Sequence, residues 1–238
     1  SGLLIAGDIS HDLTKFRHCL DILSKKFSHL FWVPGNHDLW SIESQSSKGL
    51  NKYRDCLDIC NDLNIYTPED EFFEWRSSKG IFTIVLCFIG YDYSFRPLSV
   101  SLDNAIAWAK EDNTFCTDEK YLFSTPFPTK QVWCDDRIQY TENRLNDLNQ
   151  KNLILVNHYP LTRHMVYLPR VPRFSIWSGT TKTEHWLSSY NIHTFIYGHC
   201  HVRQDQVYNN TRCCEVSFGY PNQQYWGNDL ADYLRIVI

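Results

Sequence analysis

The chain reads Phe31-Trp32-Val33-Pro34-Gly35-Asn36-His37-Asp38 where an apolar run meets three polar side chains. We interpret the run as a buried strand that ends in a tight turn. Gly35 permits a close approach of the backbone, and Pro34 ends the strand. The three polar residues suit metal or proton chemistry, but such residues also fill ordinary surface turns. The stretch therefore indicates a functional site only if other parts of the chain repeat the arrangement.

Length and composition are typical of one globular domain. The chain has 238 residues, 43% of them hydrophobic, so we expect a single α/β domain over residues 1–238. The formal charge of -4 gives no reason to expect a nucleic-acid partner, and no apolar run approaches the length of a membrane span. The nine cysteines are scattered, as in a reducing compartment, so we expect a cytoplasmic protein.

Apolar periodicity predicts alternating strands and helices. Strands are expected at residues 3–6, 31–33, 82–90, 153–156, 194–197, 213–218 and 233–238, and helices at 13–27, 50–63, 138–149 and 183–190. The run at 82–90 is apolar on both faces, which is typical of the centre of a sheet that is covered on both sides. Residues 94–133 carry three prolines and little periodicity, and we expect them to form an inserted cap.

Polar side chains directly follow four of these strands. They are Asp8, Asn36, His37, Asp38, Asn157, His158, His199 and His201. Ligands of α/β sheets bind beyond the carboxyl ends of the strands, so we expect the four ends to meet at one edge. Carboxylate, carboxamide and imidazole groups together suit Mn²⁺, Fe or Zn²⁺.

Each of these residues also has a structural interpretation when it is taken alone. Asp8 could cap the following helix, and His158 could be an ordinary turn residue. His199 and His201 would point to opposite sides of a straight strand, so both reach one site only if the chain bends there. The ordered set, rather than any single member, predicts a metal site.

The ordered set resembles the motifs of the calcineurin-like metallophosphoesterase superfamily, here Gly7-Asp8, Gly35-Asn36-His37-Asp38, Asn157-His158 and Gly198-His199-Cys200-His201. The resemblance implies a four-layer αββα sandwich with two divalent metal ions. Asp8 would bridge the metals, and His201 would belong to the first site. The second site would be completed by Asn36, His158 and His199. His37, oriented by Asp38, would lie beside the phosphate and the leaving group.

One departure from the superfamily concerns its first motif, Asp-x-His, which normally lies on a strand upstream of the Gly-Asp motif. No such motif precedes Asp8 here. We expect the strand that carries it to be missing from this chain, which would expose apolar surface and impair the first metal site.

A narrower resemblance lies outside the metal ligands. Residues 116–119, 126–128, 133–137, 169–174, 177–180 and 215–221 are similar to phosphoesterases related to phosphopantetheinyl hydrolase. The resemblance implies a phosphoesterase in which a metal-bridging hydroxide attacks a phosphodiester or phosphomonoester, releasing 4′-phosphopantetheine from an acyl or peptidyl carrier protein. Two alternatives stay open: a protein or nucleotide phosphatase or phosphodiesterase, and a non-catalytic scaffold that retains the fold.

Three arginines in the long loop after residues 153–156 are candidates for substrate binding. They are Arg163, Arg170 and Arg173. Guanidinium groups suit phosphate or an acidic carrier protein. The alternative is a solvated loop whose charges have little effect.

Overall fold

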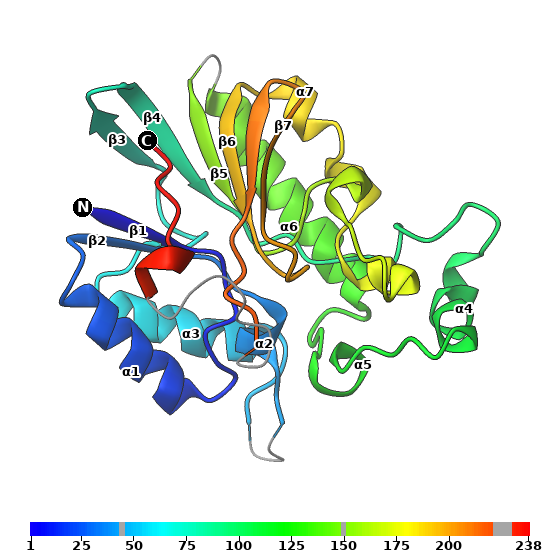
Figure 1. The fold of residues 1–238 in the computed structure, drawn as a ribbon. Helices are drawn as coiled ribbons and strands as arrows, with labels where there is room; N and C mark the ends of the chain where they lie inside the picture. Colours follow the sequence, from blue (N-terminus) through cyan, green and yellow to red (C-terminus); the bar gives the residue numbers. More distant parts are fainter. Residues whose placement is uncertain (43–45, 149–150, 221–229) are drawn as a thin grey trace.

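Two β-sheets face each other in the described chain, and helices cover the outer side of each (Figure 1). The computed structural model describes residues 1–42, 46–148, 151–220 and 230–238. The smaller sheet pairs two parallel strands, β1 (Gly2–Ile5) and β2 (His29–Trp32). The larger sheet has six strands in the order β3 (Phe73–Ser77), β4 (Gly80–Leu86), β5 (Leu153–Val156), β6 (Ile192–Tyr197), β8 (Thr211–Glu215) and β7 (Gln204–Tyr208).

The inner strands β4, β5, β6 and β8 of the larger sheet are all parallel. The edge strands β3 and β7 are antiparallel to their neighbours. Parallel strands place their carboxyl ends at the same edge of a sheet. The turns that follow β5 and β6 therefore emerge on the same side, as the sequence predicted.

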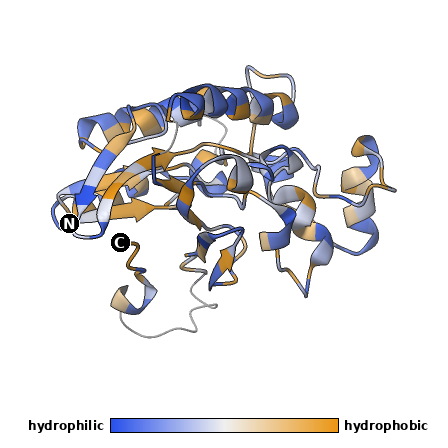
Figure 2. Ribbon diagram, turned by 90° about the horizontal axis from the view of Figure 1, so that it is seen from above, coloured by the Kyte–Doolittle hydropathy of each residue, from blue (hydrophilic) through white to orange (hydrophobic). Residues whose placement is uncertain are grey.

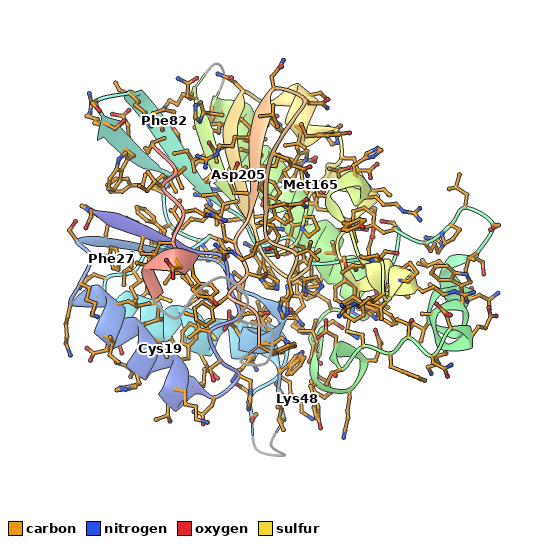
Figure 3. The ribbon with its side chains drawn as sticks, in the orientation of Figure 1. Cys19, Phe27, Lys48, Phe82, Met165 and Asp205 are labelled. Carbon is orange, nitrogen blue, oxygen red and sulfur yellow. The ribbon has the colours of Figure 1, made fainter. Side chains whose placement is uncertain are left out.

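Apolar side chains fill the space between the two sheets. Phe31 of β2 and Val33, which directly follows that strand, pack against Ile84, Ile154 and Ile196 of the larger sheet. Figure 2 shows the hydrophobic residues concentrated along the central strands and the polar residues on the outer faces of the helices. In Figure 3, Phe82 belongs to this inner cluster, whereas Met165 belongs to the cluster on the outer side of the larger sheet.

Helices form the two outer layers. The smaller sheet is covered by α1 (Leu13–Ser24) and α3 (Leu50–Asp62), whose apolar faces contain Phe16, Leu20 and Tyr53. The larger sheet is covered by α6 (Lys130–Leu145) and α7 (Trp186–Ser189), with Ile138 and Trp186 packed against the strands. This arrangement confirms the predicted four-layer αββα sandwich.

Segment 94–133 packs beside the sandwich. It contains η1 (Leu102–Asn104), α4 (Ala105–Glu111) and α5 (Asp118–Tyr121), and α4 projects away from the two termini (Figure 1). Ala105 and Ala109 of α4 share a cluster with Ile176 of η4 (Pro172–Trp177). Helix α6 begins at Lys130, so the last residues of the segment belong to an outer layer of the sandwich.

The remaining short helices are α2 (Asn36–Leu39), η2 (Asn146–Leu148), η3 (Arg163–Met165), η5 (Thr181–Thr183) and η7 (Leu230–Tyr233). Residues 234–238 form no strand, so the strand predicted at 233–238 is wrong. The helix predicted at 138–149 instead spans Lys130–Leu145. No helix in the described ranges has both the length and the apolar composition that a bilayer crossing requires.

Strands β3 and β7 were not predicted from the sequence. Both alternate between half-buried and exposed residues and carry charged side chains, such as Glu74 and Asp205. Such edge strands lack the continuous apolar run that marks a central strand.

The packing of α1 predicts a difference between two residues of similar size. Leu20 is 0% exposed in the core, whereas Ile22 on the same helix is 41% exposed. Leu20→Ala should lower the free energy of unfolding by about 2 to 5 kcal/mol, because it leaves a cavity. Ile22→Ala should change it by about 0.5 kcal/mol or less. Urea unfolding checks both, and equal losses would contradict the assigned orientation of α1.

Candidate metal centre

The four predicted strand ends meet on one side of the sandwich. Asp8 follows β1, Asn36 opens α2 after β2, and His158 and His199 follow β5 and β6. The Nε2 atom of His158 lies 3.4 Å from Asp8 Oδ2 and 3.0 Å from Asn36 Oδ1. The Nδ1 atom of His199 lies 3.3 Å from both Asn36 Oδ1 and His158 Nε2. Four side chains from distant parts of the sequence therefore converge.

The spacing of these atoms fits a shared cation. Donors about 2.1 Å from one ion stand about 3.0 Å apart at right angles and about 3.4 Å apart at tetrahedral angles. The observed separations of 3.0 to 3.4 Å fall in that range. Among the described residues, no group of three or more His, Cys, Asp or Glu side chains is by itself a preformed metal site. The convergent set described above also includes the amide oxygen of Asn36.

The protonation of His158 supports the same interpretation. Its Nδ1 lies 2.7 Å from the carbonyl oxygen of Ala6, which can only accept, so Nδ1 carries the proton and Nε2 presents a lone pair. That lone pair faces Asn36 Oδ1, a second acceptor, at 3.0 Å. Two acceptors this close repel each other unless a cation or a proton lies between them.

Burial keeps both imidazoles neutral. It lowers the pKa of His158 to about 4. Burial, with the neighbouring charge of His158, lowers the pKa of His199 well below its ordinary value. A neutral imidazole is the form that binds metals.

The backbone around Asp8 is tightly constrained. Asp8 has a left-handed conformation, with φ 63°, and its Oδ1 accepts a hydrogen bond from the backbone N–H of His37 at 2.9 Å. A Cβ atom on Gly35 would lie 2.1 Å from that same Oδ1, so the close approach predicted at Gly35 is confirmed. Burial raises the pKa of Asp8, and the charge of His37 lowers it.

Asp38 supports the main chain rather than the ring of His37. Its carboxylate accepts hydrogen bonds at 2.7 to 3.3 Å from the Trp32 indole and from the backbone N–H groups of Asp8, Ile9, Ser10 and Gly35. Within the described part of the chain, neither carboxylate oxygen bonds to the imidazole of His37. The expectation that Asp38 orients His37 is therefore corrected. The carboxylate of Asp38 instead accepts hydrogen bonds from the buried N–H groups of two turns.

His199 and His201 reach the same region because the chain bends. Both residues have left-handed backbone conformations, with φ 70° and 53°, and Cys200 N–H bonds back to the Gly198 carbonyl at 2.8 Å. The charge of His201 lowers the pKa of both Asp8 and His158. His201 therefore lies in the field of the convergent set, although its ring packs against Tyr220 with centroids 4.8 Å apart.

His37 lies at the half-buried rim of the centre. Its ring stacks on Trp40 with centroids 3.7 Å apart, and its Nε2 lies 3.3 Å from the Tyr220 hydroxyl. Burial lowers the pKa of His37, and the carboxylate of Asp8 opposes that effect. The ring is therefore held in place by aromatic contacts.

The three predicted arginines have different environments. Arg173 pairs with Glu111 at 3.0 Å, bonds to the carbonyl of Trp108 and lies over its ring, so it anchors α4 rather than a free loop. Arg163 is exposed and reaches the carbonyl of Arg96 at 3.4 Å. Arg170 is exposed, and within the described residues it has no hydrogen bond or ion pair.

Sequence reasoning assigned no role to three residues that contact the centre: Trp40, Asp118 and Tyr220. Asp118 Oδ1 accepts hydrogen bonds from the Asn36 amide at 2.9 Å and from the Trp40 indole at 2.6 Å. Asp118 and Tyr220 stood within motifs of the narrower resemblance, but nothing in their spacing linked them to Asn36 or His37. Only the packing of segment 94–133 brings Asp118 to α2.

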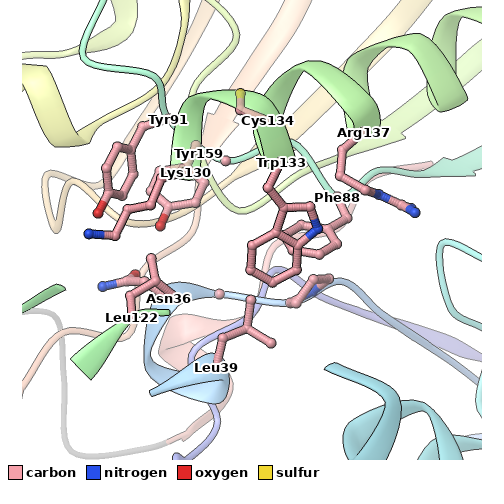
Figure 4. A pocket seen from close by; sticks show the side chains of 13 residues that line it. Asn36, Leu39, Phe88, Tyr91, Leu122, Lys130, Trp133, Cys134, Arg137 and Tyr159 are labelled. Carbon is pink, nitrogen blue, oxygen red and sulfur yellow. The ribbon is translucent and has the colours of Figure 1, made fainter. Parts of the chain in front are cut away.

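A cavity of about 30 Å³ lies beside Asn36, between α2 and α6. Figure 4 shows Tyr91, Tyr159 and Lys130 extending towards Asn36, with Trp133 and Phe88 at the other end. A cavity of that volume has room for ordered water beside the Asn36 side chain.

Residues 2–203 match the family model for Calcineurin-like phosphoesterase. The chain is 39% identical over 225 residues to "[Acyl-carrier-protein] phosphodiesterase PptH" from Mycobacterium tuberculosis, covering 93% of this chain and 69% of that protein. It is 22% identical over 250 residues to "Uncharacterized protein L509" from Acanthamoeba polyphaga mimivirus, covering 99% and 83% of the two chains. The crystal structure of Mycobacterium tuberculosis phosphopantetheinyl hydrolase superimposes with a TM-score of 0.94 at 37% identity, covering all of this chain and 85% of that one.

The contacts of Asp38 predict a loss of stability rather than a loss of activity alone. Asp38→Asn replaces an acceptor by an amide that cannot satisfy all of the N–H groups, so unfolding should become easier by about 3 kcal/mol. Asp136→Asn, on the exposed face of α6, is the matched control and should stay within about 0.5 kcal/mol. Unchanged stability of Asp38→Asn would restore a role for Asp38 beside His37.

Proposed function

This chain belongs to the calcineurin-like phosphoesterase family, and we propose that it hydrolyses the phosphodiester between 4′-phosphopantetheine and a carrier protein. The chain is a hydrolase of phosphoric esters, as its family implies. Its similarity to a protein named acyl-carrier-protein phosphodiesterase supports the choice of substrate. The observation that carries the proposal is the convergence of Asp8, Asn36, His158 and His199 within 3.0 to 3.4 Å.

Divalent metal ions are implied by the family, and we propose two of them, drawn from Mn, Fe or Zn. Asn36, His158 and His199 would hold one ion, His201 would contribute to the other, and Asp8 would be shared. Their chemistry, when bound, is to lower the pKa of water and to neutralise phosphoryl charge. The neutral, buried imidazoles of His158 and His199 support this assignment.

The proposed general acid is His37. The bond between phosphorus and the serine oxygen of the carrier breaks as a water oxygen adds to phosphorus, and the leaving serine oxygen needs a proton. His37 stands at the rim beside Asp8, with its ring held against Trp40. A half-buried imidazole in that place can reach a leaving group that the buried ligands cannot.

Recognition of the carrier protein is proposed for the exposed loop that carries Arg163 and Arg170. An acidic surface of the carrier protein would meet the exposed guanidinium of Arg170. Arg173, which is engaged with Glu111 and Trp108, would act indirectly by fixing α4. All nine cysteines are free thiols, which supports the proposal of a cytoplasmic location.

Substitution of His37 tests whether it acts as the proton donor and not as a metal ligand. His37→Ala should lower kcat by about 10²- to 10⁴-fold, because the leaving oxygen loses its proton donor. The metal content of the protein, measured by elemental analysis, should stay at the value of the unaltered chain. A parallel loss of metal and turnover would show that His37 belongs to the ligand set instead.

A substrate panel tests the proposed function itself. The protein should release 4′-phosphopantetheine from holo carrier protein faster than it hydrolyses an aryl phosphate or a nucleotide diester. Preference for either small substrate would replace the proposal with a general phosphatase or a nucleotide phosphodiesterase, and no activity on any would indicate a scaffold.

The same panel tests the role of the loop. Arg170→Ala should lower kcat/KM for holo carrier protein by about tenfold while leaving the aryl phosphate unaffected, because only the protein substrate reaches the loop. Lys79→Ala, in the exposed turn between β3 and β4, is the matched control and should change neither. Equal effects on both substrates would remove the loop from carrier recognition.

A further inference from the structure

A buried carboxylate outside the predicted ligand set contacts the centre. Asp118 is the first residue of α5 and is 0% exposed. Burial raises the pKa of Asp118, and the amine of Lys130, which opposes that effect, pairs directly with Glu119 at 3.2 Å. The charge of Asp118 is thus met mainly by N–H donors, and burial of a carboxylate in this manner is costly. Such a cost suggests that the carboxylate positions its donors.

The first donor is the amide of Asn36. Its Nδ2 donates to Asp118 Oδ1 at 2.9 Å, and its Oδ1 therefore faces His158 and His199. A carboxylate can only accept, so it discriminates between the two orientations of the amide. In the flipped orientation, two oxygens would face each other and the N–H₂ group would point at the imidazoles.

The second donor is the indole of Trp40. Its Nε1 donates to the same oxygen at 2.6 Å, and its ring stacks on His37 with centroids 3.7 Å apart. The carboxylate thereby fixes the surface against which His37 lies. Among the described residues, the other oxygen, Oδ2, has no hydrogen-bond partner, and neither has the hydroxyl of Tyr91.

We propose that Asp118 is a positioning residue, which turns the Asn36 oxygen towards the imidazoles and, through Trp40, holds the ring of His37. The inference rests on the roles that the proposed function gives to Asn36 and His37. Because Asp118 belongs to segment 94–133, the centre is complete only while that segment packs against α2. The segment would thus contribute to metal binding as well as to the shape of the entrance.

Metal affinity tests the first half of the proposal. Titration of the metal-free protein with Mn²⁺ by calorimetry should show affinity reduced by about 10- to 100-fold in Asp118→Ala, since loss of an outer partner loosens a ligand. Asp118→Asn keeps an acceptor oxygen but has no charge, and its Mn²⁺ affinity should fall about tenfold. This variant tests the proposal if Asp118→Ala fails to fold. Affinities within threefold of wild type in the folded variants would overturn the proposal.

Two further variants separate positioning from general packing. Glu119→Gln removes the neighbouring charge, which contacts Tyr93, Trp177 and Lys130 but not Asn36, and should leave Mn²⁺ affinity unchanged. Trp40→Phe keeps a ring over His37 without the N–H group, and should lower kcat several-fold at unchanged Mn²⁺ affinity. Loss of affinity in either variant equal to that of Asp118→Ala would overturn a specific role for Asp118.

The failure of this proposal is distinguishable from that of the proposed function. A wild-type chain that binds Mn²⁺ but does not act on holo carrier protein would remove the substrate assignment and leave the Asp118 comparison intact. If instead the chain acts on carrier protein but its Asp118 variants bind Mn²⁺ normally, the role of Asp118 is removed and the substrate assignment stands.

Discussion

The carboxylate of Asp38 is the contact on which the rest of the centre depends. The loops after β1 and β2 each contain N–H groups that no strand partner satisfies, and one buried anion accepts from both loops. Buried N–H groups are paired almost without exception in folded proteins. The pairing draws Gly35 against Asp8 so closely that no side chain fits between them. The position of Asp8 is thereby set by the protein itself.

Support for the centre comes from both sides. The sandwich supplies the strand ends and holds His158 through the carbonyl of Ala6. Segment 94–133 supplies Asp118 to the opposite side of Asn36. The side chain of Asn36 is therefore held between two partners, so its orientation is fixed before anything binds there. The buried aromatic residues Tyr91 and Trp177 pack the segment in place.

Much of this architecture could be predicted from the sequence because parallel strands in a covered sheet are continuous apolar runs. The turns after those runs revealed Asp8, Asn36, His158 and His199. Edge strands β3 and β7 could not be found in this way, since their alternating polar residues resemble those of loops. The partners of Asp38 could not be predicted either. Most of them are backbone N–H groups, which residue identity does not distinguish. Asp118 lies 82 residues from Asn36, and only tertiary packing joins them.

Arg173 illustrates a further limit of sequence reasoning. Its position in a long loop suggested contact with a substrate, but it pairs with Glu111 and bonds to the carbonyl of Trp108 on α4. A charge is drawn to the nearest satisfactory partner within the protein, and sequence spacing does not reveal whether one exists. Arg170, which precedes Arg173 in the same loop, has no such neighbour among the described residues and is exposed.

The left-handed backbone at Asp8, His199 and His201 has a consequence for how such a centre can evolve. Among residues with side chains, this conformation is tolerated best by asparagine, aspartate and histidine. Substitutions at these positions are therefore restricted to a few residue types. Glutamate or a branched residue would introduce backbone strain together with its new side chain. The main chains of Asn36 and His158 do not have this conformation. The left-handed backbone at these three turns therefore limits which side chains can replace Asp8, His199 and His201.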